Sequence, residues 1–170
     1  MTGRPERAEA APEYFRYIDL VPGDDILARL EAQLGETLAF LGGIGEEKSR
    51  HRYAPEKWSM RQVLGHVNDG ERLFLFRAFW FARGLDAPLP GYDEDRVAVV
   101  AQADRFAWSA HIEDFRAARS STLAFFRNLP AEAWMAKGVA NDNPFTVRAL
   151  AYTLAGHVAH HTKVLKEKYL

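Results

Sequence analysis

The sequence predicts an all-α protein, a four-helix bundle with a long crossover between its second and third helices. Apolar residues recur every three or four positions in four long segments, whereas no segment has the alternating pattern of a half-buried strand. Hydrophobic residues make up 48% of the 170 residues, which is enough to build a core. The interval between the second and third segments, residues 85–105, is long for a connection inside a compact domain.

The first two segments carry recognisable helix ends. The first begins at Asp24, a good N-cap residue, and Gly42-Gly43 ends it. The second begins at Ser59, where Gln62 three residues later completes a capping-box pattern. It leads into an aromatic cluster of Phe74, Phe76, Phe79, Trp80 and Phe81. Core packing accounts for part of this cluster, and because the stretch is apolar nearly all round, we expect a homodimer to bury the rest.

The third and fourth segments complete the bundle. The third starts near Trp108 and ends before Pro130, and the fourth is capped by Thr146 and continues past Leu165. The intervals 43–58 and 130–145 contain proline, glycine and asparagine and predict ordinary loops, with a turn at Asn141-Asp142-Asn143-Pro144.

Histidines in the second and fourth segments are placed so that they can meet. His157 and His161 are four residues apart and therefore share one face of a helix. At ~1.5 Å per residue, His66 lies about 10 Å from the start of its helix, and the pair lies about 15 Å from the end of theirs. The three side chains meet at similar depth if the two helices are antiparallel.

The crossover follows from this match. A simple up-and-down bundle makes the second and fourth helices parallel, whereas a crossover between the second and third makes them antiparallel. Returning along a helix of roughly 37 Å needs about 11 extended residues. Residues 85–105 supply that length.

Three imidazoles from two helices leave coordination positions free, which is typical of a working metal site. We expect a divalent ion held by His66, His157 and His161, with zinc or nickel favoured and iron, manganese and cobalt as alternatives. His160 is an alternative to His161. We expect packing or surface positions for the remaining histidines, His51 and His111.

The source of a catalytic base is less evident. Val158 and Ala159 stand where His-Glu-x-x-His proteases carry their glutamate, so a base must come from elsewhere or the metal must acidify water directly. Asp69 and Glu71 are candidate carboxylates near His66, unless they belong to a solvated face or to ion pairs. Three residues of the 85–105 interval are further candidates to reach over the site, namely Tyr92, Asp93 and Asp95, but a plain surface loop is the interpretation that we favour for them.

Composition excludes several functions. The net charge of −1 without a basic run argues against nucleic-acid binding, and no apolar run reaches the ~18 residues of a membrane span. The absence of cysteine and of an apolar N-terminal stretch fits a cytoplasmic protein. We expect one domain over residues 1–170, with residues 1–12 as a flexible segment.

Two motifs resemble a known family. The segment from Tyr53 to His66, with Trp58-Ser59 in its middle, and the downstream His157-x-x-His160-His161 are similar to the DinB-like superfamily, which includes bacillithiol- and mycothiol-transferase relatives. The similarity covers the chain from about residue 24 onward. It implies a four-helix bundle with a crossover, frequent homodimers and a divalent metal on the same three histidines.

The resemblance implies several possible functions rather than one. Some relatives transfer a low-molecular-weight thiol to an electrophile, and others resemble hydrolases or isomerases. We therefore expect a metal-dependent enzyme that activates a low-molecular-weight thiol or water and acts on a small molecule. The alternative is a non-catalytic, stress-related metal-binding bundle.

Overall fold

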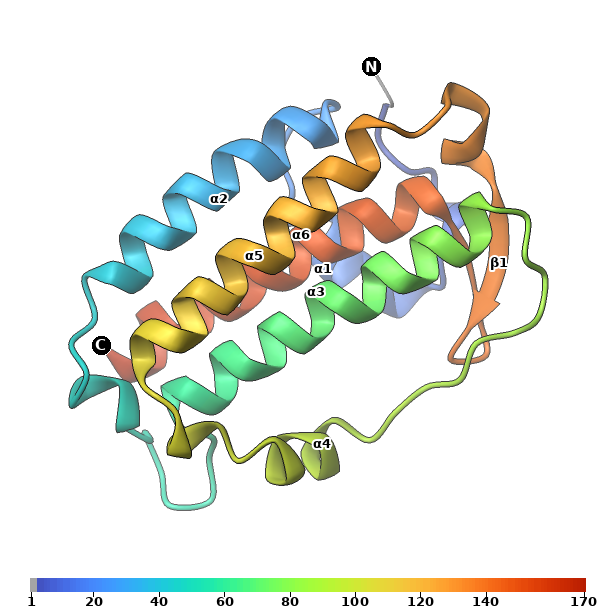
Figure 1. Cartoon of the computed structure of the whole chain (residues 1–170). Coiled ribbons are helices and arrows are strands. Elements are labelled where there is room, and N and C mark those ends of the chain that lie inside the picture. The colour runs from blue at the N-terminus through green and yellow to red at the C-terminus, as the bar shows by residue number, and fades with distance from the viewer. Residues whose placement is uncertain (1–2) are drawn as a thin grey trace.

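Four long helices form the body of the protein (Figure 1). The computed structural model describes residues 3–170. The four helices are α2 (Ile26–Gly42), α3 (Met60–Ala82), α5 (Trp108–Arg127) and α6 (Val147–Val164). The smaller elements are α1 (Phe15–Ile18), α4 (Glu94–Ala101), β1 (Lys137–Ala140), β2 (Asn143–Thr146) and a π-helical turn, Leu165–Tyr169, that continues α6. The predicted four-helix bundle is confirmed.

Side-chain caps begin three of the four long helices. Ser59 Oγ accepts a hydrogen bond from the Gln62 backbone at 3.1 Å, and Gln62 Oε1 accepts one from the Ser59 backbone at 3.0 Å, so the predicted capping box is present. Thr146 caps α6, also as predicted. Asp25 rather than Asp24 caps α2, because the chain enters the helix one residue later than the sequence pattern indicated.

The predicted crossover sets the directions of the helices. His66 lies beside His157 and Trp58 lies beside Tyr169, so α3 and α6 are antiparallel. Asn68 of α3 contacts Asp114 of α5, and Glu71, further along α3, contacts Arg119, further along α5. These two helices are therefore parallel. The connection between them runs back along the outside of the bundle and carries α4, a helix that the sequence had not indicated (Figure 1).

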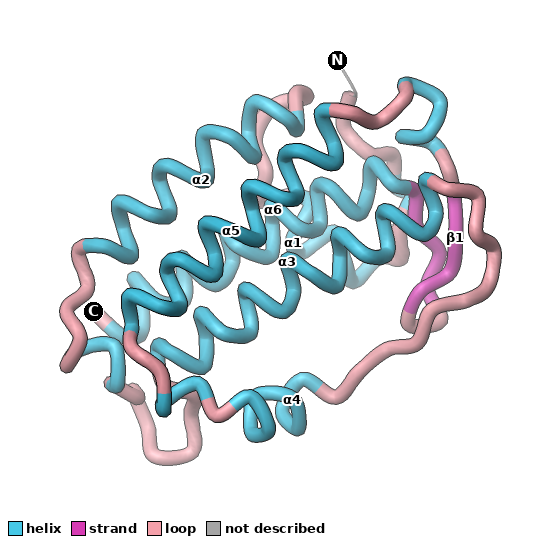
Figure 2. Tube along the Cα trace, in the orientation of Figure 1, coloured by secondary structure: helices cyan, strands magenta, loops and turns pink. Residues whose placement is uncertain are grey.

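A β-hairpin replaces the loop expected at residues 130–145 (Figure 2). Its strands pair Lys137 with Thr146, and each has only four residues, too short to give a clear alternating pattern. Asn141 and Asp142 form the turn with φ values of 52° and 60°, a left-handed conformation that these residue types tolerate. The predicted turn is therefore present, as the tip of a hairpin.

The N-terminal segment packs against the hairpin and the start of α6, which differs from the flexible segment expected for residues 1–12. Ala10 pairs with Phe145 of β2, and Glu9 is 6% exposed. Glu9 Oε2 accepts hydrogen bonds from Thr146 Oγ1 at 2.7 Å and from Arg148 Nε at 3.0 Å. These partners are distant in sequence, so no local pattern indicates them. Residues 1 and 2 lie outside the described part of the chain.

A polar layer crosses the middle of the apolar core. Arg119 of α5 forms an ion pair with Glu71 of α3 and donates from Nη1 to Gln33 Oε1 of α2 at 2.9 Å. Gln33 in turn donates to the carbonyl of Ala155 in α6 at 2.9 Å. All four long helices are therefore joined by one buried network.

Within residues 3–170, no helix has both the length and the hydropathy that crossing a bilayer requires.

Candidate metal centre

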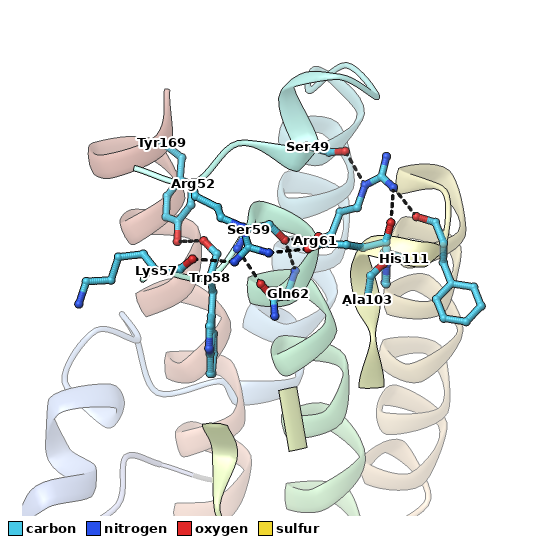
Figure 3. Close-up of polar contacts among 12 residues, drawn as sticks. Ser49, Arg52, Lys57, Trp58, Ser59, Arg61, Gln62, Ala103, His111 and Tyr169 are labelled. Atoms are coloured by element: carbon cyan, nitrogen blue, oxygen red, sulfur yellow. Dashed lines mark hydrogen bonds and ion pairs between the residues drawn. The ribbon is translucent and has the colours of Figure 1, made fainter. Parts of the chain in front are cut away.

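The start of α3 is anchored by a buried arginine (Figure 3). Arg61 is 1% exposed, donates from Nε to Ser49 Oγ at 2.8 Å and from Nη1 to the carbonyl of Phe106 at 2.7 Å, and pairs with Glu46. These partners lie before α3 and at the end of the crossover. The first turn of α3 is thus tied to both of its neighbouring connections.

Trp58, just before α3, is held from the other side. Tyr169 Oη donates a hydrogen bond to the Trp58 carbonyl at 2.8 Å (Figure 3). The Trp58 ring lies against the His66 imidazole, with 5.1 Å between the ring centroids. The tryptophan of the DinB-like motif therefore helps to orient the histidine that follows it.

Two glycines allow close packing around His157. A Cβ on Gly70 of α3 would lie 2.7 Å from His157 Cε1, so the α3 backbone itself leaves space for the ring. A Cβ on Gly156 would lie 2.0 Å from the carbonyl oxygen of Tyr17, so glycine allows α1 to pack directly on α6. The Tyr17 ring then contacts His157 edge-on, with 5.5 Å between centroids.

The structure brings His66, His157 and His161 together. One ligand-capable atom from each lies within 4.8 Å of the other two, and the Nε2 atoms of His66 and His157 are 2.9 Å apart. Nitrogens bound at 2.0–2.1 Å to one tetrahedral zinc ion lie about 3.4 Å apart. Small side-chain adjustments therefore suffice for the three to share one ion, and we refer to them as the histidine trio.

Burial keeps the histidine trio neutral, which is the form that binds a metal. Burial, together with His161 and His66, holds the pKa of His157 well below its usual range. Burial and the neighbouring histidines lower the pKa of His161 to about 3. Burial also lowers the pKa of His66, although the nearby carboxylates of Glu94 and Asp69 oppose it. An uncharged set of three imidazoles fits a divalent transition-metal ion.

The other histidines have different surroundings. His160 lies outside the group of ligand atoms and contacts Tyr17 and His161 edge-on, at 5.5 Å and 5.0 Å between centroids. His111 Nε2 hydrogen-bonds with the Ala103 carbonyl at 2.9 Å. His51 is exposed and contacts the Tyr169 ring at 6.3 Å.

The two carboxylates suggested by the sequence lie in different places. Glu71 pairs with Arg119 and its side chain has no exposed surface, so it cannot reach a substrate. Asp69 lines a small cavity with His66 and Glu94, and burial raises its pKa. Only Asp69 therefore stays near the histidine trio.

Sequence reasoning missed Glu94, the first residue of α4. Its Oε2 lies 3.9 Å from His66 Nε2. Asp93, one of the alternatives in this interval, caps α4 by accepting from the Arg96 backbone at 3.0 Å. No sequence spacing relates residues of the crossover to residues of the long helices. The carboxylates of the crossover are expected near the site only once the crossover is known to return along α3.

Besides the small cavity beside Asp69, two larger cavities reach the histidine trio. One of about 190 Å³ opens on His66 and His157 and is also lined by Tyr92, Glu94 and Arg77. Burial and the nearby Glu94 raise the pKa of Tyr92 to about 12, so its hydroxyl is a hydrogen-bond donor. A separate cavity of about 330 Å³ opens on His161, where Trp58, Asp95 and Tyr169 line it.

Comparison with known proteins agrees with this architecture. The family model of the DinB superfamily matches residues 29–165. Among solved structures, the chain is similar to YfiT from Bacillus subtilis, with a TM-score of 0.69 and 16% identity over 96% of this chain and 89% of that one. YfiT is described as a probable metal-dependent hydrolase with an unusual four-helix bundle topology. No match was found among curated proteins. The family match includes residues of all four long helices, and the chain therefore belongs to the DinB superfamily.

Proposed function

We propose that this protein is a divalent-metal-dependent enzyme in which His66, His157 and His161 hold the ion. The observation that carries the proposal is the histidine trio itself, three neutral imidazoles that converge beside a cavity. A divalent ion held in this way supplies a Lewis acid that lowers the pKa of a bound thiol or water. The donor set favours zinc or nickel, with iron, manganese and cobalt as alternatives.

The residues around the cavity supply proton acceptors and donors. Glu94 and Asp69 both lie beside His66 and are the side chains that we propose to accept a proton from the substrate thiol or from water. Tyr92 keeps its hydroxyl proton and can donate a hydrogen bond within the cavity. Trp58 holds the His66 ring in place.

The two cavities favour a reaction between two small molecules. One opens on His66 and His157 and the other on His161, so two ligands can approach the same centre by different routes. Transfer of a low-molecular-weight thiol to an electrophile needs two such binding regions. Hydrolysis needs only one, because water is the second reactant.

We also retain the homodimer and the cytoplasmic location as proposals. Phe76 and Phe79 of α3 are 47% and 39% exposed, and they are the apolar side chains that a second copy would cover. Sedimentation of the wild type beside a Phe76→Ser/Phe79→Ser variant tests the dimer, which the variant should shift towards the monomer.

Turnover assays on stripped and reloaded protein test the enzymatic proposal. Chelator-treated protein is reloaded with Zn²⁺, Ni²⁺, Mn²⁺ or Co²⁺ and assayed with a panel of esters and amides and with thiols plus an aromatic halide electrophile. We expect turnover with at least one metal, its loss in His161→Ala, and its retention in the control variant His111→Ala. Metal-dependent stability without turnover on the whole panel would instead support the non-catalytic bundle.

A further inference from the structure

Arg77 of α3 is a buried cation without a carboxylate partner. It is only 3% exposed. The other two deeply buried arginines pair with acids, Arg61 with Glu46 and Arg119 with Glu71. Among residues 3–170, the groups that influence Arg77 are the hydroxyls of Tyr14 and Tyr92, and no carboxylate compensates its charge.

The hydrogen bonds of Arg77 are also incomplete. Nη2 donates to the carbonyl of Pro90 at 3.1 Å, and the nearby Tyr14 hydroxyl raises the pKa of Arg77 without offsetting the effect of burial. Nε is buried and has no hydrogen-bond partner among the described residues. Burial lowers the pKa of Arg77, yet a guanidinium stays charged in proteins. A buried charge with an unused donor is unfavourable unless an anion completes it.

Arg77 faces the cavity that opens on the histidine trio. Both Arg77 and His157 line it, and both contact the Phe74 ring. The Phe74 ring centroid lies 5.9 Å from the guanidinium carbon and 5.7 Å from the His157 ring centroid. The guanidinium carbon of Arg77 and the His157 ring centroid therefore lie within about 12 Å of each other.

A second arginine adds positive charge to this cavity. Arg16 lies at its exposed side and donates from Nη2 to the Tyr17 hydroxyl at 2.9 Å. No carboxylate pairs with Arg16 within residues 3–170, and its charge reaches the histidine trio, where it helps to lower the pKa of His161. Against these two arginines stands one carboxylate in the lining, that of Glu94, so the net charge of the lining is positive and favours an anionic ligand.

We propose that this cavity binds a small molecule with a carboxylate group, held by Arg77 while the reacting end of the molecule faces the histidine trio. The proposal rests on the proposed function and names its substrate class. A carboxylate matches the single charge and planar donors of one guanidinium. The volume of about 190 Å³ is below the ~300–1,000 Å³ of common ligand pockets, which favours a short or narrow molecule.

Thiols with and without a carboxylate test the proposal. Co²⁺-loaded protein is titrated with ω-mercaptoalkanoates of three to eight carbons, each beside the mercapto-alcohol of equal length, and thiolate binding is followed in the cobalt spectrum. At the best chain length, we expect the acid to bind at least about tenfold more tightly than the alcohol, because charge-assisted hydrogen bonds contribute that much. Arg77→Met should abolish the difference, and the surface variant Arg127→Met should keep it.

A metal-free measurement keeps this test independent of the metal. Hexanoate, and not hexanamide, should raise the thermal midpoint of stripped wild-type protein, and Arg77→Met should remove that effect. Arg77→Met without ligand should melt at or above the wild-type temperature, because the change removes an uncompensated buried charge. Arg77→Gln serves in its place if the methionine variant does not fold.

Each outcome separates the two proposals. Absence of cobalt binding or of any thiolate signal counts against the proposed function alone, since the hexanoate measurement still tests Arg77. Equal binding of acids and alcohols at every length, or equal effects of hexanoate and hexanamide, overturns the carboxylate site. Tighter binding of the matching phosphonate overturns the choice of carboxylate. A lower melting temperature in Arg77→Met with an unchanged preference for acids assigns Arg77 a structural role only.

Discussion

Glu71 and Arg119 form a two-pronged ion pair at the centre of the bundle, and neither side chain is exposed. Arg119 Nε lies 2.6 Å from Glu71 Oε1, and Nη2 lies 3.0 Å from Oε2. Because Gln33 extends the contact to α2 and α6, this pair fixes how the helices that carry the histidine trio pack together.

Breaking this pair should be costly. We expect Glu71→Ala or Arg119→Ala to lower the free energy of unfolding by about 3–5 kcal/mol, because each leaves a buried charge alone. The double variant Glu71→Leu/Arg119→Met should lose less than either. Urea unfolding measures this, with Arg116→Ala as a control whose exposed pair contributes at most about 1 kcal/mol. Single variants as stable as the wild type would show that the network does not support the fold.

Trp58 should report metal binding through its fluorescence. Its ring lies 5.1 Å from the His66 ring, so a paramagnetic ion at the histidine trio is close enough to quench it. We expect Co²⁺ or Cu²⁺ to quench wild-type emission up to one equivalent, with most of the effect lost in Trp58→Phe. Trp134→Phe is the matched control, since Trp134 stacks on Phe126 and belongs to the same core cluster as Phe145 of the hairpin. Equal quenching in the two variants would place the ion elsewhere.

The metal-free protein should lose stability in mild acid. The pKa values of His157 and His161 lie below the usual 6.5, so below pH 6.5 the unfolded chain binds protons that the folded chain does not. Stability therefore falls as the pH drops from 6.5 towards the pKa of His161, about 3, by up to about 1.4 kcal/mol per pH unit for each histidine.

Thermal or urea unfolding between pH 7 and 5 measures this loss. The variant His157→Gln/His161→Gln should show a flatter dependence, whereas His51→Gln, at an exposed histidine, should follow the wild type. The same slope in all three proteins would mean that the histidine trio is not kept neutral by burial.

Glu9 should stabilise the start of α6 at neutral pH. Burial alone would raise its pKa, but hydrogen bonds from Arg148, the Glu6 backbone and Thr146 hold the pKa below its usual range. The contribution is present above pH 4.5 and is lost as the pH falls through the lowered pKa. We expect Glu9→Gln to cost about 1–3 kcal/mol at pH 7.

Melting curves at pH 7 and in acid test the role of Glu9, with Glu13→Gln as the exposed control. The difference between Glu9→Gln and wild type should shrink in acid, where the wild-type carboxyl is itself protonated. A difference that does not change with pH would point to packing rather than to the charge of Glu9.

Local sequence patterns predicted the starts of the helices and their relative directions well. The caps at Ser59 and Thr146 follow from residues a few positions apart, and the equal depths of His66 and the His157–His161 pair required antiparallel helices. These features depend only on helical geometry, which is the same in every protein. The crossover followed because it alone makes those helices antiparallel.

Contacts between distant segments were beyond such reasoning. Glu94 reaches His66 only because the crossover returns along α3, and Arg77 stands out only once its neighbours are known to lack a carboxylate. Glu71 and Asp69, two residues apart, looked equivalent in the sequence. Packing of α5 against α3 then paired the first with Arg119 and left the second beside the cavity.

The metal content of reconstituted protein tests the central claim most directly. Wild type, His66→Ala/His157→Ala and the control His51→Ala/His111→Ala are each loaded with Zn²⁺, dialysed and analysed for metal by mass spectrometry, with circular dichroism to verify folding. We predict one tightly held ion per chain in the wild type and the control, and none in the folded His66→Ala/His157→Ala variant. Undiminished zinc in that variant would contradict the assignment of the histidine trio as the metal site.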